Sequence, residues 1–235
     1  MACRFALFFI LLGLCPAFAA HYPIKLGDTT VTILREQRGI GHAFVHLHQN
    51  ETTALKAIKV ILREQGGSLL TLKHRGGRNI VFHIHHHRYE FDPNRMFTDV
   101  GIKKSLSQYG HYDKVAHKEV KKLARQIKKF LSKGKIVAVH NNRSYSLKNY
   151  LPGKSLSSDI EALHFNKKKQ YRNFFLVTKK SDYLRLKQLN FNSIWQSHQV
   201  RDDGSLSVYL SNRDYVNVEC GYRSLQEQIN MLKHA

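Results

Sequence analysis

A buried strand that runs directly into an amphipathic helix is the feature that most constrains the fold of this chain. The segment HAFVHLH, residues 42–48, is mostly apolar, as is typical of a strand inside a sheet. The next segment, TTALKAIKVILREQGG, carries Leu55, Ile58 and Leu62 at helical spacing and ends at Gly66–Gly67. A strand followed by a helix of this kind favours an α/β fold.

Strand-like and helix-like segments alternate along the rest of the chain. Strands are expected within residues 24–37 (a strand or hairpin), 68–74, 79–86, 135–142 and 173–180, with two short strands around a polar turn within 205–219. Helices are expected at residues 117–134, 181–189 and 224–233, and a long polar loop at residues 141–173. The sequence therefore predicts a single α/β domain over residues 21–235, with a mixed, mainly parallel sheet flanked by helices.

The first twenty residues are typical of a secretory signal peptide. Arg4 precedes an apolar run from Phe5 to Leu14, and the small-residue pattern Ala17–Ala19 closes the segment. The run is too short for a transmembrane helix, and no later segment of the sequence is long and apolar enough to span a membrane. We therefore expect cleavage near Ala19 or Ala20, and a periplasmic or secreted bacterial protein.

The charge of the chain is strongly positive. It carries 38 Lys and Arg residues against 17 Asp and Glu residues, a formal net charge of +21. In an exported protein this favours anionic envelope polymers, peptidoglycan or lipid surfaces as partners over nucleic acid, although a generally basic proteome has the same effect. Cys220 would be the one cysteine left after cleavage, which excludes an internal disulfide.

Three residues in two segments suggest the ligands of a metal. Metal-dependent hydrolysis requires three protein ligands and an open position for water. His48 and Glu51 have the spacing at which both side chains converge where a strand meets a helix, although an accidental polar turn has the same sequence. His140 ends a short apolar strand, where α/β sheets place functional residues, and a buried core histidine is the alternative.

Two further positions suggest groups that act on a substrate. Arg95 belongs to a polar cluster that Phe91 and Phe97 flank in the sequence. Arginine binds carboxylates through two parallel hydrogen bonds. A structural turn with a salt bridge is the alternative there. Glu219 lies in an apolar strand, where an unpaired carboxylate is costly, so it suits general acid–base catalysis unless a cation pairs with it.

The order of these motifs resembles the zinc metallocarboxypeptidase superfamily, which also contains the succinylglutamate desuccinylase and aspartoacylase-like deacylases. HQNE, residues 48–51, is similar to its paired metal ligands, and DPNRMF, residues 92–97, is similar to its DxNRxF segment. His140 resembles the third ligand and Glu219 resembles the catalytic glutamate. The separation of Glu51 from His140 is shorter than is usual in the family, which leaves the choice of substrate open.

The resemblance implies a mechanism with Zn²⁺ as cofactor. The ion would be held by His48, Glu51 and His140 and would lower the pKa of a bound water. Glu219 would accept a proton from that water and pass it to the leaving amine, while the metal and a nearby arginine stabilise the oxyanion.

The resemblance also implies how a substrate is held. Asn94 and Arg95 would orient a free carboxylate, so that the amide bond cut lies beside it. Arg143 and Tyr145 are expected to line the substrate site. Two roles of the family have two candidates each: Arg78 or Arg143 for polarising the carbonyl, and Tyr145 or Tyr150 for the mobile tyrosine.

These observations favour an exported zinc hydrolase of the carboxypeptidase or amidase type, with cell-wall peptides as a reasonable substrate. An N-acyl amino acid deacylase would use the same zinc ligands, and a non-catalytic cationic envelope-binding protein would not need Glu219. A histidine-rich metal buffer is a fourth possibility, because His83, His85 and His87 would share one face of a strand. Exposure on an edge strand is the alternative for these histidines, and His46 is expected behind the main site as packing or support.

Overall fold

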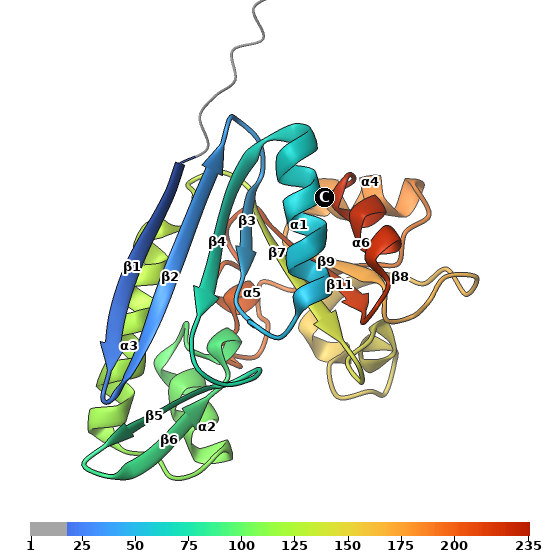
Figure 1. Ribbon diagram of the computed structural model, residues 1–235. Helices are drawn as coiled ribbons and strands as arrows, with labels where there is room; N and C mark the ends of the chain where they lie inside the picture. The colour runs from blue at the N-terminus through green and yellow to red at the C-terminus, as the bar shows by residue number, and fades with distance from the viewer. Residues whose placement is uncertain (1–17) are drawn as a thin grey trace, which may run out of the picture.

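A nine-stranded sheet organises the computed structural model, which describes residues 18–235 (Figure 1). The strand order is β1-β2-β4-β3-β7-β11-β9-β10-β8. Its strands are β1 (Phe18–Leu26), β2 (Thr29–Arg38), β3 (Ala43–His46), β4 (Gly67–Lys73), β7 (Ile136–Asn142), β8 (Ile160–His164), β9 (Phe174–Val177), β10 (Ser193–Gln196) and β11 (Tyr215–Gly221). A separate two-stranded sheet pairs β5 (Ile80–Ile84) with β6 (His87–Phe91).

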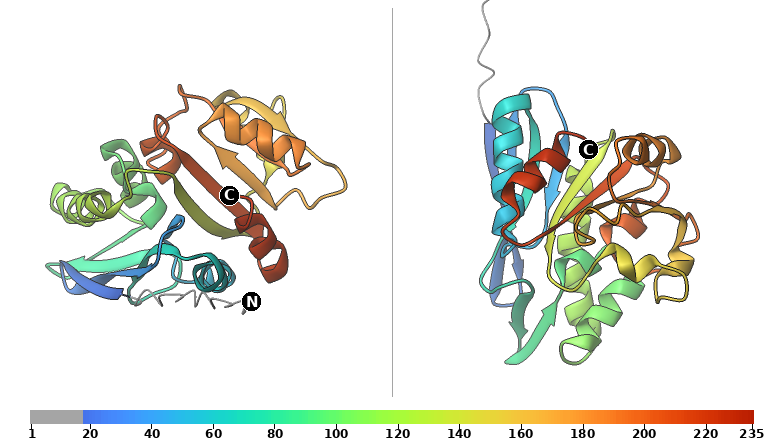
Figure 2. Two further views of the ribbon diagram at one scale, coloured as in Figure 1. Left: turned by 90° about the horizontal axis from the view of Figure 1, so that it is seen from above. Right: turned by 90° about the vertical axis from the view of Figure 1, so that its right-hand side faces the viewer.

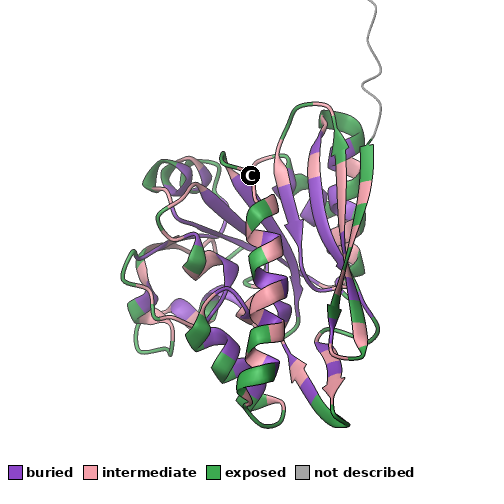
Figure 3. Ribbon diagram, turned by 90° about the vertical axis from the view of Figure 1, so that its left-hand side faces the viewer, coloured by how far each residue is buried: buried purple, intermediate pink, exposed green. Residues whose placement is uncertain are grey.

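The predicted mixed sheet is confirmed, and its parallel pairs lie mainly at its centre. Strands β4, β3, β7 and β11 run parallel to their neighbours in that order, and β9 pairs in parallel with β10. The remaining four pairs, including the predicted opening hairpin of β1 and β2, are antiparallel. The central strands are buried along their length, as Figure 3 shows. The buried residues of the central strands satisfy their backbone hydrogen bonds within the sheet. Side chains at the ends of these strands are therefore available to form a site.

Helices cover both faces of the sheet (Figure 2). The α-helices are α1 (Thr52–Gln65), α2 (Asp99–Gln108), α3 (Lys114–Phe130), α4 (Lys180–Gln188), α5 (Leu206–Tyr209) and α6 (Leu225–Leu232). Apolar side chains of α1, α4 and α6 belong to one buried cluster, and those of α2, α3 and α5 belong to the other. The layers are therefore helix, sheet, helix, as the alternating pattern predicts.

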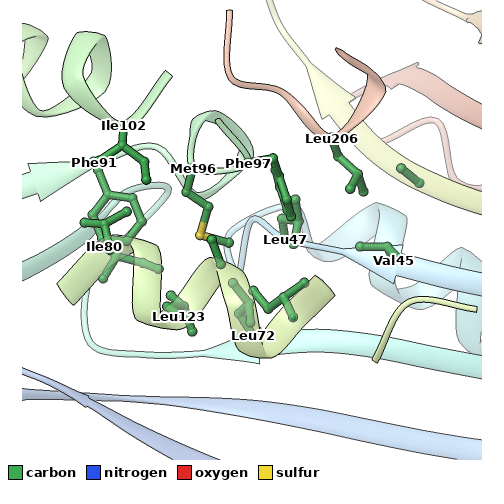
Figure 4. Packing of buried hydrophobic residues seen from close by; sticks show 14 of the residues in the cluster. Val45, Leu47, Leu72, Ile80, Phe91, Met96, Phe97, Ile102, Leu123 and Leu206 are labelled. Atoms are coloured by element: carbon green, nitrogen blue, oxygen red, sulfur yellow. The ribbon is translucent and has the colours of Figure 1, made fainter. Parts of the chain in front are cut away.

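The core between the sheet and α3 shows why these residues fold together. Leu123 of α3 lies beside Leu72 of β4 and Met96 in the buried cluster to which α2, α3 and α5 contribute (Figure 4). The helix begins at Asp113, whose carboxylate accepts hydrogen bonds from the backbone N–H of Val115 and Ala116 at 2.7 and 3.0 Å. Its start therefore precedes the predicted one by a turn, because the cap rather than the apolar pattern decides where a helix begins.

The structure corrects the expected strand pair in residues 205–219. Leu206–Tyr209 form the short helix α5, and only Tyr215–Gly221 form a strand. The Ser205 hydroxyl accepts a hydrogen bond from Val208 N, as an N-cap does, and the Asn94 side chain accepts another from Leu206 N at 3.1 Å. These contacts, one of them from a distant segment, override the strand-like alternation of the sequence.

Several segments differ from the sequence prediction in smaller ways. The expected polar loop contains two short 3-10 helices, Leu147–Tyr150 and Ser157–Asp159, and the edge strand β8. Strands β6 and β10 and helix α2 have no counterpart in the predicted elements.

The predicted signal peptide falls mostly on residues 1–17, outside the described residues, while residues 18–20 begin β1. Among residues 18–235, the structure contains no helix with the length and apolar character needed to cross a membrane.

Candidate metal centre and active site

The site lies where three parallel strands of the sheet end. Strands β3, β7 and β11 run in the same direction, so their carboxyl ends meet at one edge. His48 follows β3 by two residues, His140 lies near the end of β7, and Glu219 lies directly beside His140 in the register of β7 and β11. Glu51 is the residue before α1, so the short link from β3 to α1 brings it back toward His48.

The side chains of His48, Glu51 and His140 converge in the interior. The two Nδ1 atoms lie 3.2 Å apart, and each lies 3.1 Å from one oxygen of Glu51. None of the three side chains is more than 3% exposed. Within residues 18–235, they are the one group of three or more such donors that converges closely enough to hold a metal ion.

The donor set and its spacing fit a zinc ion. Two donors about 2.0–2.1 Å from one tetrahedral zinc ion lie roughly 3.3 Å from each other, close to the separation of the two imidazole nitrogens. Two histidines and one carboxylate are a donor set of catalytic zinc sites, which keep a further position open. Side chains that mostly accept hydrogen bonds face one another here, so a cation or a shared proton is needed to hold them together.

Asp92 fixes the orientation of His48. Its Oδ1 accepts a hydrogen bond from His48 Nε2 at 2.7 Å, which leaves the Nδ1 atom facing Glu51 and His140. A carboxylate behind a ligating histidine sets the tautomer and the ring direction. Sequence reasoning assigned no role to Asp92, although its place in the DPNR cluster beside the assigned Asn94 was a usable signal.

The charges of the site depend on one another. Burial alone would lower the pKa of His48, but the carboxylates of Glu51 and Asp92 outweigh it and raise the pKa to about 9. Burial would raise the pKa of Glu51, but the facing imidazoles of His48 and His140 hold it well below its usual range. Without metal, the centre therefore holds a protonated His48 between two ionised carboxylates.

A neutral histidine supports the site from behind, as predicted. His46 is fully buried, and its ring bridges Thr71 Oγ1 and the backbone oxygen of Glu51, each at 3.0 Å. Burial lowers the pKa of His46 to about 4. The ring therefore stays uncharged at neutral pH and holds the backbone of a ligand in place.

Two buried carboxamides complete this frame, and sequence reasoning did not find their role. Asn141 donates its backbone N–H to Glu51 Oε2 at 3.0 Å and accepts from Ala54 N, in the first turn of α1, at 2.8 Å. Gln228 of α6 accepts from the Asn141 side chain at 2.8 Å and donates to the backbone oxygen of His140 at 2.9 Å. Helix α6 is therefore hydrogen-bonded to the β7 segment that carries His140, and Asn141 of that segment in turn bonds Glu51 and the start of α1. Because Gln228 lies far along the chain, no local pattern indicates it.

Two of the candidate ligands, Glu51 and His140, line a cavity of about 600 Å³. Residues from distant parts of the chain line it, including every residue predicted to act on a substrate: Asn94, Arg95, Arg143, Tyr145 and Glu219. Glu219 is buried at 6% exposure and forms no ion pair with Lys, Arg or His within residues 18–235. The alternative in which a cation neutralises it is therefore not what the structure shows.

The two arginine candidates for the carbonyl occupy different places. Arg78 lines the cavity, contacts Glu51 Oε1 and lies 3.7 Å from Asp92 Oδ2. Arg143 is exposed, and its guanidinium lies over the ring of Tyr222, 5.1 Å from the ring centre. Only Arg78 therefore reaches the metal ligands.

The other predicted substrate groups are held by their neighbours. Arg95 lies 3.4 Å from Asp203 across the cavity wall and is 40% exposed, so its guanidinium is open to a ligand. The hydroxyls of Tyr145 and Tyr150 hydrogen-bond to each other, and burial raises the pKa of both. Both tyrosines are therefore neutral, and because one hydroxyl donates to the other, one proton of the pair is left to donate.

The conspicuous histidines lie elsewhere. His85 and His86 form the turn between β5 and β6 with φ of 47° and 68°, the backbone of a tight hairpin. His83 pairs with Asp28 at 3.0 Å, and His87 is exposed on β6. A single strand face carrying His83, His85 and His87 does not form, because the chain reverses between them.

Comparison with known proteins finds similarity in structure alone. No protein-family model matches the sequence, and no curated protein matches it. The chain is similar over 94% of its length to a metallo-carboxypeptidase from Burkholderia cenocepacia, with 10% identity, a TM-score of 0.46 and 65% of that chain covered. A candidate carboxypeptidase from Burkholderia mallei has the same identity, TM-score and coverage of this chain, with 64% of its own length covered. The chain thus spans slightly less than two thirds of each structure.

Proposed function

We propose that this protein is a zinc-dependent hydrolase of the carboxypeptidase type, which cleaves an amide bond beside a free carboxylate. The supporting observation is that Glu51 and His140 of the buried His48-Glu51-His140 centre line one cavity together with Glu219, a carboxylate without a cation, and Arg95, an arginine suited to bind a carboxylate. The motif order in the sequence supports the same function.

Each side chain has a chemical task that its position allows. When bound by His48, Glu51 and His140, a zinc ion supplies Lewis acidity and lowers the pKa of water. Glu219, beside His140 in the sheet, accepts a proton from the attacking water and returns it to the leaving amine.

The substrate is held by charge and hydrogen bonds. Arg95 binds its carboxylate, and the Asn94 side chain, whose oxygen already accepts from Leu206 N, offers its N–H group to the same carboxylate. Arg78 donates to the carbonyl oxygen, because it alone of the two candidates lies against the ligands. One hydroxyl of the neutral pair Tyr145 and Tyr150, the one that does not donate to its partner, donates to the peptide from the cavity wall.

We also propose export and a cell-wall peptide as substrate. The signal-like composition of residues 1–20 and the net charge of +21 support a location next to anionic envelope polymers. Fusion of residues 1–25 to a reporter that is active only outside the cytoplasm tests export. Sequencing of the processed N-terminus should begin at Ala20 or His21, and a mature chain that retains Met1 would contradict the proposal.

Metal analysis is the decisive experiment for the proposed function. Purified protein is expected to bind one equivalent of zinc, to lose it in His48→Ala, and to keep it in Glu219→Gln. Glu219→Gln should nevertheless lower hydrolysis by about 10²–10⁴-fold, the usual contribution of a general acid–base group. Activity is measured on a panel of peptides, muropeptides and N-acyl amino acids with free or amidated carboxylates.

The controls separate the possible failures. Deletion of residues 83–87 should leave the zinc content unchanged. If the deletion variant loses zinc while His48→Ala keeps all of it, the metal lies outside the proposed site. Hydrolysis of amidated and free substrates at equal rates would contradict the role of Arg95. Hydrolysis of N-acyl amino acids but not peptides would identify a deacylase with the same centre.

A further inference from the structure

Two carboxamides hold the two oxygens of Glu219. Asn142 Nδ2 donates to Oε2 at 3.0 Å, and Asn217 Nδ2 donates to Oε1 at 3.1 Å. All three side chains are buried at 6% exposure. The carboxylate is therefore satisfied by one neutral donor on each oxygen, in a place where an unsatisfied charge would be costly.

The sheet fixes this arrangement. Asn217 and Glu219 are two residues apart on β11, so both side chains point to the same face. The parallel register places Glu219 beside His140 of β7 and Gly221 beside Asn142. Asn142 therefore reaches Glu219 diagonally from the neighbouring strand, on the face that also carries His140.

The hydrogen bonds fix the orientation of both amides. The oxygens of Glu219 accept from Nδ2 of each asparagine, so each side chain turns its NH₂ group toward Glu219. The Oδ1 atoms then point away, and both are buried without a hydrogen-bond partner within residues 18–235. Asn142 has a second contact, to the backbone oxygen of Arg172 at 2.9 Å, but the bond to Glu219 is the only side-chain hydrogen bond of Asn217 found there. Burying an unpaired oxygen is unfavourable, so Asn217 needs a reason to be there other than stability.

We propose that Asn142 and Asn217 are positioning residues that hold Glu219 toward the cavity and beside His140. The proposal rests on the proposed function, in which Glu219 exchanges protons during hydrolysis. A lysine or arginine partner would also fix the carboxylate, but it would bind the ionised form more strongly and oppose proton transfer to it. Two neutral donors fix the direction of the carboxylate and leave it able to accept a proton.

Kinetics of single variants test the positioning role. Asn217→Leu and Asn142→Leu keep a similar volume but remove the donor, so kcat should fall about tenfold or more, since small misplacements of a reacting group are costly. KM should stay within about twofold, and zinc content should be unchanged. Asn217→Thr, which suits a strand and restores a hydroxyl donor, should recover part of kcat. Asn192→Leu removes another buried asparagine, which lies in the link between α4 and β10, and should change kcat little.

A double-mutant cycle separates positioning from stability. If Asn217 acts through Glu219, then Asn217→Leu should have no further effect on kcat in a Glu219→Gln background. A structural role would instead lower kcat by the same factor in both backgrounds, and this result would overturn the proposal. Unchanged kcat in both single Leu variants would overturn it as well.

The side-chain amide signals in NMR give a readout without turnover. Hydrogen bonds to a carboxylate should move the NH₂ resonances of Asn142 and Asn217 in the metal-free protein, and Glu219→Gln should shift both, while the resonance of Asn192 stays in place. If the wild-type protein hydrolyses no substrate of the panel, the proposed function fails, yet these shifts still show whether the carboxamides hold Glu219. If both resonances are insensitive to Glu219→Gln, the positioning proposal fails, whatever the enzyme hydrolyses.

Discussion

His48 carries two interactions on one imidazole ring, and the metal site depends on both. Its Nε2 atom is committed to Asp92, and its Nδ1 atom faces Glu51 and His140. A ring that was free to turn would offer the metal a nitrogen only part of the time. We therefore expect the carboxylate behind this candidate ligand to contribute to metal affinity without contacting the metal.

Replacement of that carboxylate should weaken metal binding. Asp92→Asn keeps the shape of the side chain but removes its negative charge. It also presents one oxygen and one NH₂ group to His48 in place of two oxygens. We expect zinc affinity to fall about 10–100-fold, the usual effect of losing such support. Competition with a zinc indicator measures it. Glu90→Gln, which removes a neighbouring carboxylate that lies outside the centre, is the matched control, and equal losses in both variants would contradict the role of Asp92.

The raised pKa of His48 predicts how pH acts on the metal-free protein. The folded pKa of about 9 lies above the unfolded value near 6.5. Protonation therefore stabilises the fold fully below about pH 6.5, and this contribution is lost as pH rises through about 9. Urea denaturation of chelated protein between pH 6 and 9.5 should show the decline, and His48→Gln should flatten it.

The same shift predicts that metal and proton compete for His48. At pH 7 the ring is protonated without metal, so zinc binding should release about one proton, and apparent affinity should rise with pH up to about 9. Calorimetry in buffers with different ionisation enthalpies counts the protons. Zinc binding without proton release at pH 7 would mean that His48 is neutral in the metal-free protein.

At the scale of elements, α2 and the segment before α5 meet at two glycines. A Cβ atom on Gly101 of α2 would lie 2.1 Å from Gly204 Cα and 2.7 Å from the backbone oxygen of Arg95. The Phe97 N–H also donates to Gly204 O at 3.0 Å. This close approach therefore sets the position of the backbone that presents Arg95 to the cavity.

A single methyl group should disturb that junction. Gly101→Ala should destabilise the protein by about 1–3 kcal/mol, the usual cost of overpacking, and should raise KM for substrates with a free carboxylate because Arg95 moves. Urea denaturation and steady-state kinetics measure the two effects. Gly110→Ala is the matched control, since no heavy atom lies within 4 Å of its added Cβ. A neutral Gly101→Ala would show that the junction yields without cost.

At the scale of the whole molecule, the metal centre joins parts of the chain that are distant in sequence. The candidate ligands come from the end of β3, the start of α1 and the end of β7, and α6 is hydrogen-bonded to the last of these segments through Gln228. A ligand that binds only the folded state stabilises the whole fold. Zinc is therefore expected to act as a structural support as well as a cofactor.

Zinc should raise the stability of the chain measurably. At a free concentration 100 times Kd, one site contributes about 2.7 kcal/mol. Thermal denaturation with and without a chelator should show the shift, and His48→Ala, which lacks a ligand, should show little of it. Equal zinc stabilisation of the wild type and His48→Ala would place the bound metal elsewhere, for example at residues 83–87.

The sequence by itself determined the class of the fold and the candidate ligands. The apolar periodicity of residues 42–65 and the strand ending at His140 are local signals, because a strand and a helix each bury their own face. His48 and Glu51 are equally local, since three residues separate them. These features could be predicted because neighbours in the chain are neighbours in space.

Only the tertiary structure decided which residues hold the candidate ligands and Glu219 in place. Asp92, Asn217 and Gln228 act on groups 44, 2 and 88 positions away, and only parallel pairing brings β7 beside β11. The contact of Asn217 with Glu219, two residues away, could not be predicted from the sequence either, because it depends on burial of the strand face. The α5 helix replaced an expected strand for the same reason: a donor–acceptor contact from Asn94 outweighed a weak local preference. Such contacts form only when distant strands pair in the sheet, so no periodic pattern in the sequence predicts them.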